Sequence, residues 1–330
     1  MSAAPGRPKQ ARTAVRSAEA GAPHLTLIEL VDAAAARLDA AGVSFGHGTD
    51  NAFDEAAWLV LWRLGLPLDT PLDGPEDASA AVTSQQQAGV EELLARRIST
   101  RMPAAYLTGE AWLQGVAFHA DARAIVPRSL IAELLVSGAL DYWVAPSPRR
   151  VLDLCTGGGS LAILAARHWP EAAVDAADIS TDALAVARVN LQRHALEARI
   201  RLLQGDGCAP VDGPYDIVLC NPPYVNSTSM RALPLEYRAE PALALDGGAD
   251  GMDFVRTLLR DAPAHMAASA ALVLEIGHER DHFEAAFPGL EAVWLDTRAG
   301  GDQVCILTRA ALAACNPRTD ASLRRQNPKP

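Results

Sequence analysis

Hydrophobic positions divide the chain into a part with helical spacing and a later part in which short apolar runs alternate with helical stretches. Between residues 25 and 101, apolar side chains recur every three or four positions, first at Leu27, Leu30, Val31, Ala34 and Leu38. The same spacing returns from Phe53 to a stop at Gly65, and a third helix is expected over residues 84–98. The sequence therefore predicts a small helical domain at residues 25–101.

From residue 150 onward the pattern changes to short apolar runs separated by helical stretches. We expect strands at residues 151–154, 173–177, 200–204, 217–220, 271–276, 292–296 and 304–308. We expect helices at residues 161–168, 181–194, 251–266 and 279–287. Such alternation is typical of an α/β fold with an open, mostly parallel sheet.

The segment between these parts, residues 102–128, loses the helical period. Residues 106–110 and 116–119 are expected to be short strands of a hinge hairpin, and Ser129 to cap a helix that runs to about Trp143. Residues 1–24 are expected to be a disordered extension rather than a transit peptide, and residues 311–330 a disordered tail.

Composition narrows the class of protein. Apolar residues make up 49% and charged residues 21% of the 330, as in globular proteins. The net charge of −11 argues against a protein that coats nucleic acid, so no stable nucleic-acid binding is expected. Five cysteines without a C-x-x-C pair indicate free thiols in a reducing, cytoplasmic setting, and no apolar run is long enough to span a membrane.

The strand predicted at residues 217–220 runs directly into Asn221-Pro222-Pro223-Tyr224. Two prolines cannot donate to a sheet ladder, so they end the strand in a stiff, extended bend. That bend presents an amide side chain, backbone carbonyls and an aromatic ring together. Asn221 and a proline carbonyl would accept the two protons of a planar NH2 group, while Tyr224 would stack on its face.

A glycine turn follows the first predicted strand of the α/β part. Gly157-x-Gly159-x-x-Ala162 matches the dinucleotide fingerprint, and Asp178 lies where an acidic residue would bind ribose hydroxyls. Asp153 stands just before the turn, where it would repel a pyrophosphate but attract the amino group of a methionine moiety. These residues leave two cofactors open, NAD and S-adenosylmethionine, and Asp153 favours the second.

Together these motifs resemble those of class I S-adenosylmethionine-dependent methyltransferases that act on planar nitrogens. Within that class the chain looks like the bacterial protein-(glutamine-N5) methyltransferases, whose hinge motifs are similar to residues 103–110 and 126–129. Cys155, Arg128-Ser129 and residues 236–241 resemble the branch that modifies ribosomal protein L3. Gly158-Gly159-Ser160 departs from that branch, in which Ser-Gly-Cys is more frequent.

The resemblance implies a Rossmann-like sheet of seven strands, S-adenosylmethionine as cofactor and a set of site residues. The cofactor set is Asp153, Cys155, Thr156, Gly157, Gly159, Asp178, Asp206, Gly207 and Asn221. The catalytic set is Asn221, Pro222 and Tyr224, and Pro223 joins them in binding substrate. The implied partner is a ribosomal protein, free or in early assembly particles.

Other interpretations remain at this point. A release factor glutamine is the alternative protein substrate, and the exocyclic amine of adenine in DNA is another planar NH2 group. The segment from His278 to His282 matches the H-E-x-x-H zinc motif, but it is expected to be a surface helix with solvated histidines, and no metal is expected.

Overall fold

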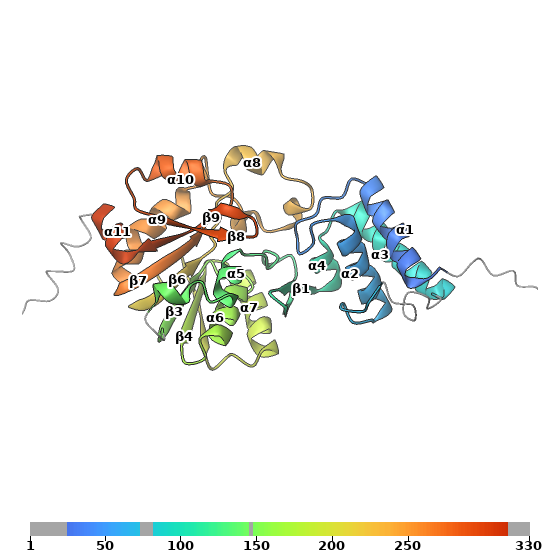
Figure 1. Ribbon diagram of the computed structural model, residues 1–330, viewed down its shortest axis with the longest axis horizontal. Helices are drawn as coiled ribbons and strands as arrows, with labels where there is room; N and C mark the ends of the chain where they lie inside the picture. The colour runs from blue at the N-terminus through green and yellow to red at the C-terminus, as the bar shows by residue number, and fades with distance from the viewer. Residues whose placement is uncertain (1–24, 73–81, 145–147, 316–330) are drawn as a thin grey trace, which may run out of the picture.

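The computed structural model describes residues 25–72, 82–144 and 148–315. A helical unit lies beside a larger α/β unit (Figure 1). The extension expected at residues 1–24, and residues 316–330 of the expected tail, lie outside the described residues. Residues 311–315 were wrongly assigned to that tail, because they belong to helix α11 (Arg309–Cys315), which buries Leu312.

Three of the helices in the helical unit are α1 (Leu27–Ala40), α2 (Ala52–Leu64) and α3 (Ser84–Thr100). Thr26 begins α1 with a capping box, and Gly65 ends α2 at a φ of 70°. Phe53, with which the second helical pattern begins, is 40% exposed. Helix α2 packs against both α1 and α3, and it buries Trp58, Leu59 and Leu61 in these contacts.

The hinge hairpin is β1 (Glu110–Leu113) and β2 (Val116–His119), paired antiparallel. Residues 106–110 were predicted as a strand, but residues up to 108 form the short helix α4 (Ala104–Thr108). Pro103 begins that helix and Gly109 ends it at a φ of 73°. Helix α4 buries Ala104, Ala105 and Leu107 in the core of the helical unit, so tertiary packing determines its conformation.

The α/β unit contains a seven-stranded sheet in the order β5-β4-β3-β6-β7-β9-β8. Its strands are β3 (Arg150–Leu154), β4 (Ala173–Asp178), β5 (Ile200–Gln204), β6 (Tyr215–Cys220), β7 (Met266–Glu275), β8 (Val293–Thr297) and β9 (Gly300–Thr308). The pairs from β5 to β7 are parallel and the two pairs that involve β9 are antiparallel. The predicted α/β fold with seven strands is confirmed.

Helices cover both faces of this sheet. The remaining ones are α5 (Ile131–Val136), α6 (Ser160–His168), α7 (Thr181–Arg193), α8 (Ser227–Ala232), α9 (Asp253–Asp261) and α10 (Arg280–Ala286). Val151 and Ile217 pack with α5 and α6, whereas Leu152 and Val218 pack with α9 and α10. Successive strand residues point to opposite faces, so both faces are apolar and the strands read as continuous apolar runs.

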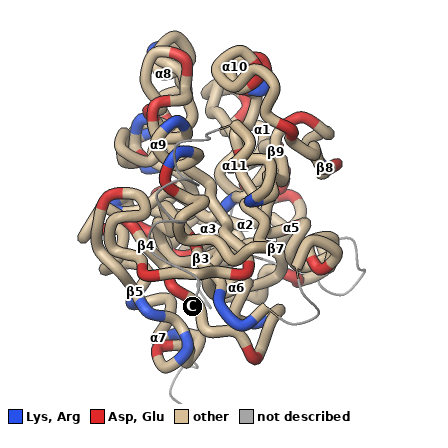
Figure 2. The backbone as a smooth tube through the Cα atoms, turned by 90° about the vertical axis from the view of Figure 1, so that its left-hand side faces the viewer, with Lys and Arg blue, Asp and Glu red and all other residues tan. Residues whose placement is uncertain are grey.

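The helix after Ser129 is shorter than predicted. Helix α5 ends at Val136 and is followed by Gly138 at a φ of 78°, and a separate 3-10 turn covers Asp141–Trp143. Leu130 rather than Ser129 is the N-cap residue. The Ser129 hydroxyl donates a hydrogen bond to Glu275 at 2.5 Å and accepts one from the N–H of Ile131 at 3.2 Å. Acidic and basic positions are interspersed along the backbone of the α/β unit (Figure 2).

Candidate active site

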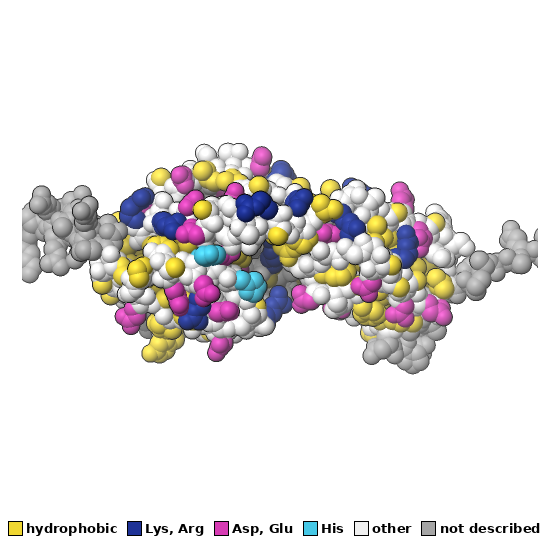
Figure 3. All heavy atoms as spheres, turned by 90° about the horizontal axis from the view of Figure 1, so that it is seen from above, with side chains coloured by type: hydrophobic (Ala, Val, Ile, Leu, Met, Phe, Trp, Pro, Cys, Tyr) yellow, Lys and Arg dark blue, Asp and Glu magenta, His cyan; other side chains and the backbone are white. Residues whose placement is uncertain are grey.

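The carboxyl ends of four adjacent strands, β5, β4, β3 and β6, meet beside one cavity of about 890 Å³. Ligands of open α/β sheets bind in this position, and the volume lies within the usual range for small-molecule sites. The predicted residues that line the cavity are Cys155, Thr156, Gly157, Asp178, Asp206, Gly207, Asn221, Pro222, Pro223 and Tyr224. Seen from above, the molecule is hollowed where its two units meet (Figure 3).

The glycine turn and Asp178 form one connected structure. The N–H of Gly157 donates to Asp178 Oδ2 at 2.9 Å, and the N–H of Ser180 donates to Asp178 Oδ1 at 2.8 Å. Burial raises the pKa of the Asp178 carboxyl. Each carboxylate oxygen can accept a further hydrogen bond. Asp178 is therefore held rigidly at the cavity wall with acceptor capacity that remains for hydroxyl groups of a ligand.

Asp153 and Gly159 are not among the cavity-lining residues. Asp153 is fully buried, and its Oδ2 accepts hydrogen bonds from Thr156 Oγ1 at 2.5 Å and from the N–H of Ala162 at 3.0 Å. A Cβ atom at Gly159 would lie 3.2 Å from the Cβ of Ala187. The structure thus gives these two residues a different place from the one predicted. Asp153 holds the turn in shape, and Gly159 allows α6 and α7 to pack closely.

Asn221, Pro222, Pro223 and Tyr224 lie together at the end of β6, as the sequence predicts for a bend that follows a buried strand. Among the described residues, none forms a hydrogen bond with the side chain of Asn221. Its amide is consequently available to a ligand in the cavity. Burial raises the pKa of the Tyr224 hydroxyl, and the nearby Glu275 carboxylate raises it further.

Two glycines missed in the sequence position the Tyr224 ring and backbone. A Cβ atom at Gly277, whose φ is +52°, would lie 2.6 Å from Tyr224 Cε2. A Cβ atom at Gly251 would lie 2.2 Å from the carbonyl oxygen of Tyr224. Only glycine permits these approaches without displacement of the tyrosine. Gly277 follows β7 almost directly, and its place after a buried strand was the available signal.

Glu275 is a third residue that the sequence did not reveal. Its carboxylate is buried and lines the cavity, and it accepts hydrogen bonds from Ser129 Oγ and from the N–H of Leu130 at 2.9 Å. Burial raises the pKa of this carboxyl. Glu275 thereby joins the end of β7 to the segment that enters α5, behind Tyr224.

The chain is similar to known methyltransferases. It is 56% identical over 290 residues to the ribosomal protein uL3 glutamine methyltransferase of Bordetella pertussis, and the match covers 87% of this chain and 96% of that protein. Proteins of the same name from Burkholderia pseudomallei and Neisseria meningitidis serogroup B are 49% and 45% identical. They cover 88% and 87% of this chain, and 97% and 94% of their own lengths.

The chain belongs to the family of ribosomal protein uL3 glutamine methyltransferases. A family model described as a methyltransferase small domain matches residues 133–236, which include the glycine turn, Asp178 and Asn221. The prediction of a methyltransferase in the ribosomal-protein branch is confirmed, and S-adenosylmethionine is the cofactor that the family uses.

The cavity of this methyltransferase fits that cofactor. Asp178 offers carboxylate oxygens suited to ribose hydroxyls, and the turn at Gly157 brings the backbone to the cavity wall without a side chain. Asp206 and Gly207 line the far end, where Phe254 Cε2 lies 3.8 Å from the Cβ position of Gly207. An aromatic ring beside the end of β5 provides a flat apolar surface for a base.

The H-E-x-x-H segment of this methyltransferase does not form a zinc site. Glu279 Oε2 contacts His282 Nδ1 at 2.5 Å, and its Oε1 accepts from Asn226 Nδ2 at 2.7 Å. His278 precedes α10 and lines the cavity, so the expectation of a surface helix is wrong for this residue, although its side chain is exposed as expected. Across residues 25–72, 82–144 and 148–315, no three His, Cys, Asp or Glu side chains are grouped to hold a metal ion.

The sequence also makes the segment after Tyr224, residues 226–250, a candidate docking groove for the protein substrate, lined by Arg231, Arg238 and nearby prolines. Leu233, Pro234 and Tyr237 of this segment line the cavity, but the two arginines do not. Arg238 instead donates to the carbonyl of Leu233 at 3.2 Å, and Arg231 to Thr228 Oγ1 at 3.1 Å.

In the part of the chain that the structure describes, no helix is both long and apolar enough to span a bilayer.

Proposed function

We propose that this enzyme methylates the side-chain amide nitrogen of a glutamine in ribosomal protein uL3. One observation carries the proposal. A single cavity contains two groups of residues: the glycine turn after β3 with Asp178 at the end of β4, and Asn221 with Tyr224 after β6, which lies next to β3. A methyl donor on the first group of residues would therefore meet an amide on the second.

The residues at the end of β6 supply orientation rather than covalent chemistry. An amide nitrogen is a weak nucleophile because its lone pair is delocalised into the carbonyl group. Asn221 Oδ1 and the carbonyl of Pro222 would accept its two N–H groups, and would stabilise the positive charge that develops on nitrogen. Tyr224 would hold the plane of the amide. Bound S-adenosylmethionine supplies the electrophilic methyl group.

No general base of ordinary pKa is needed, because an N-methylated amide cation loses its proton readily. His278 lines the same cavity and is the histidine to test for such a role. The rate at saturating substrate should change little between about pH 6.5 and 8.5, the interval in which a histidine base titrates. His278→Asn should leave that profile flat. A steep limb in this interval that disappears in His278→Asn would assign His278 as a base.

We further propose that residues 25–101 recognise the substrate protein, which is offered free or in early assembly particles in the cytoplasm. Asn221, Pro222 and Tyr224, which we call the amide clamp, would bind only the end of a glutamine side chain. Selectivity for one protein must therefore come from surfaces outside the clamp. The net charge of −11 favours encounter with a basic ribosomal protein and predicts slower methylation at higher ionic strength.

The decisive experiment offers the purified enzyme labelled cofactor together with one substrate at a time. The substrates are uL3, both class I release factors, finished large ribosomal subunits and duplex DNA. Label on a glutamine of free uL3, and much less on finished subunits, supports the proposal. Transfer mainly to a release factor would assign the chain to the sister activity, and transfer to DNA would reject a protein substrate.

A further inference from the structure

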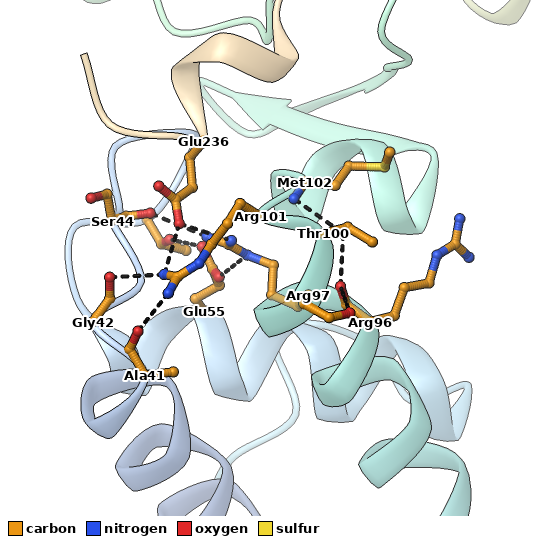
Figure 4. A network of polar contacts seen from close by, with 12 residues as sticks. Ala41, Gly42, Ser44, Glu55, Arg96, Arg97, Thr100, Arg101, Met102 and Glu236 are labelled. Carbon is orange, nitrogen blue, oxygen red and sulfur yellow. Dashed lines mark hydrogen bonds and ion pairs between the residues drawn. The ribbon is translucent and has the colours of Figure 1, made fainter. Parts of the chain in front are cut away.

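Residues 226–246, which we call the strap, leave the site directly after Tyr224 and return to it. The N–H of Val225 donates to the carbonyl of Leu245 at 2.8 Å, and the N–H of Gly247 donates to the carbonyl of Val225 at 2.9 Å, which closes the base of the strap. Its far part reaches the helical unit (Figures 1 and 4). The strap is therefore a bridge between the two units, as well as a wall of the cavity.

Glu236 of the strap is buried against α3 of the helical unit. Its Oε1 accepts hydrogen bonds from Arg97 and Arg101, each at 3.4 Å (Figure 4). Arg97 is 0% exposed, and it also donates to Glu55 Oε1 at 2.7 Å and to the carbonyl of Ser44 at 3.1 Å. The carboxylates of Glu55 and Glu236 thus neutralise the guanidinium groups of Arg97 and Arg101 where the strap meets the helical unit.

Glu240 is held four residues further along the strap. It forms a two-point ion pair with Arg128, with distances of 2.6 and 2.7 Å, and its Oε1 also accepts the N–H of Val126 at 2.9 Å. His47 Nε2 from the helical unit lies 3.4 Å from its other oxygen. The Arg128 pairing lowers the pKa of this carboxyl against the opposing effect of burial, to about 2, so Glu240 is ionised at neutral pH.

The strap residues that face the cavity lie beside these two carboxylates. Tyr237 follows Glu236, and Pro241 follows Glu240, and both line the cavity. Leu243 also lines it and is 58% exposed, so it is accessible to a macromolecule at the cavity mouth. Any shift of the carboxylates would move these side chains relative to Asn221.

Buried ion pairs define geometry more than they add stability. Removing charges from water costs about as much as their attraction returns, but a buried guanidinium is satisfied in one arrangement only. Apolar contacts alone would let the strap slide over the helical unit. Glu236 and Glu240 disfavour those alternative positions, because a shifted strap would leave either buried carboxylate without the guanidinium groups that neutralise it.

We infer that Glu236 and Glu240 are positioning residues. They fix the strap to the helical unit, so that the surface that recognises the substrate protein lies at a set distance from the amide clamp. The inference rests on the proposed function for its substrate. It predicts that loosening either carboxylate weakens productive binding of the protein substrate, while the cofactor site, built on β3 to β5, is unaffected.

The test compares Glu236→Gln and Arg101→Gln with the matched control Glu91→Gln. The control removes an ion pair with Arg37 that lies entirely within the helical unit. Arg101 is the more exposed of the two arginines on Glu236, so its variant is expected to fold even where Glu236→Gln does not. For each protein, kcat and KM for uL3 and the Kd for S-adenosylmethionine are measured, together with hydrogen exchange of the strap amides.

Both strap variants should raise KM for uL3 at least about tenfold, since the binding surface is then no longer preorganised relative to the site. They should leave kcat within about threefold and cofactor Kd within about twofold, and exchange should accelerate across the strap. Glu236→Asp, which keeps the charge, should raise KM for uL3 less than Glu236→Gln does. Glu91→Gln should match the wild type.

Equal losses in kcat, KM and cofactor affinity would indicate general loosening and would overturn the inference. So would unchanged KM and unchanged strap exchange in folded variants. If the wild type does not methylate uL3 at all, the proposed function fails instead. Hydrogen exchange and cofactor binding then decide the positioning role independently of the substrate.

Discussion

Replacing Asp153 with Asn should change the stability of this protein in a pH-dependent way. The Asp153 side chain is fully buried, and Oδ2 accepts hydrogen bonds from Thr156 and Ala162. Its other oxygen, Oδ1, has no hydrogen-bond partner among the described residues. Burial therefore raises the pKa of this carboxyl from an ordinary value of 3.8 to about 7.

The sign of the effect follows from this raised pKa. Below about pH 4 the carboxyl is neutral in both the folded and the unfolded chain, and its stabilising contribution is complete. As the pH rises toward 7, the unfolded chain loses the proton first, so the folded state becomes relatively less stable. A gap of roughly 3 pKa units corresponds to about 4 kcal/mol, which is fully lost above pH 7. Asparagine carries no charge and escapes this loss.

The measurement is urea unfolding of the cofactor-free wild type and Asp153→Asn at pH 5 and pH 8, followed by tryptophan fluorescence. The free energy of unfolding of the variant minus that of the wild type should increase by about 2–3 kcal/mol between the two pH values. Asp212→Asn is the control. Asp212 is exposed and paired with Arg150, which lowers the pKa of its carboxyl, so this variant should show no gain at pH 8.

A difference between Asp153→Asn and wild type that stays within about 0.5 kcal/mol from pH 5 to pH 8 would refute the reasoning. It would mean that the buried carboxyl does not titrate in this interval. The role of Asp153 in holding the glycine turn would then have to rest on an ionised side chain.

Three further variants address the site. Asn221→Ala should lower turnover by about a hundredfold or more, because one preorganised polar group is lost, while the cofactor Kd measured by calorimetry changes much less. Asp178→Ala should weaken S-adenosylmethionine binding by roughly 1.5–3 kcal/mol in the same assay. Gly277→Ala, at a φ of +52° and with its Cβ 2.6 Å from Tyr224, should lower the free energy of unfolding by about 1–3 kcal/mol and reduce turnover.

The sheet and the bend at Asn221 were predictable because local sequence determines them. Buried parallel strands have apolar residues on both faces, so residues 217–220 of β6 stand out as an uninterrupted apolar run. Strands β3 and β4 are mostly apolar, although Asp153 and Asp175 interrupt them. A Pro-Pro pair ends a strand whatever surrounds it. The place of these segments at adjacent carboxyl ends then follows from the topology of an open α/β sheet.

Contacts between distant segments were not predictable from local sequence. Residues 106–108 lack a helical period, yet they form part of α4 because its apolar side chains pack into the helical unit. Glu236 and Glu240 read as surface charges, since carboxylates are seldom buried. Their burial depends on arginines far away in the sequence, such as Arg97 and Arg128, and no local pattern announces such a pairing.

The asparagines illustrate why the structure is needed to assign the reacting position. Asn190 donates to the carbonyls of His119 and Gly158 and accepts the N–H of His119, and Asn226 caps α8 and donates to Glu279. Both are fully used in holding backbone or side chains, as is usual for polar groups inside a protein. Asn221 has no such bond within the described residues, although it lies on the wall of the cavity. An amide without protein partners at the end of a rigid strand is free to bind a ligand, and a substrate amide supplies the complementary N–H groups.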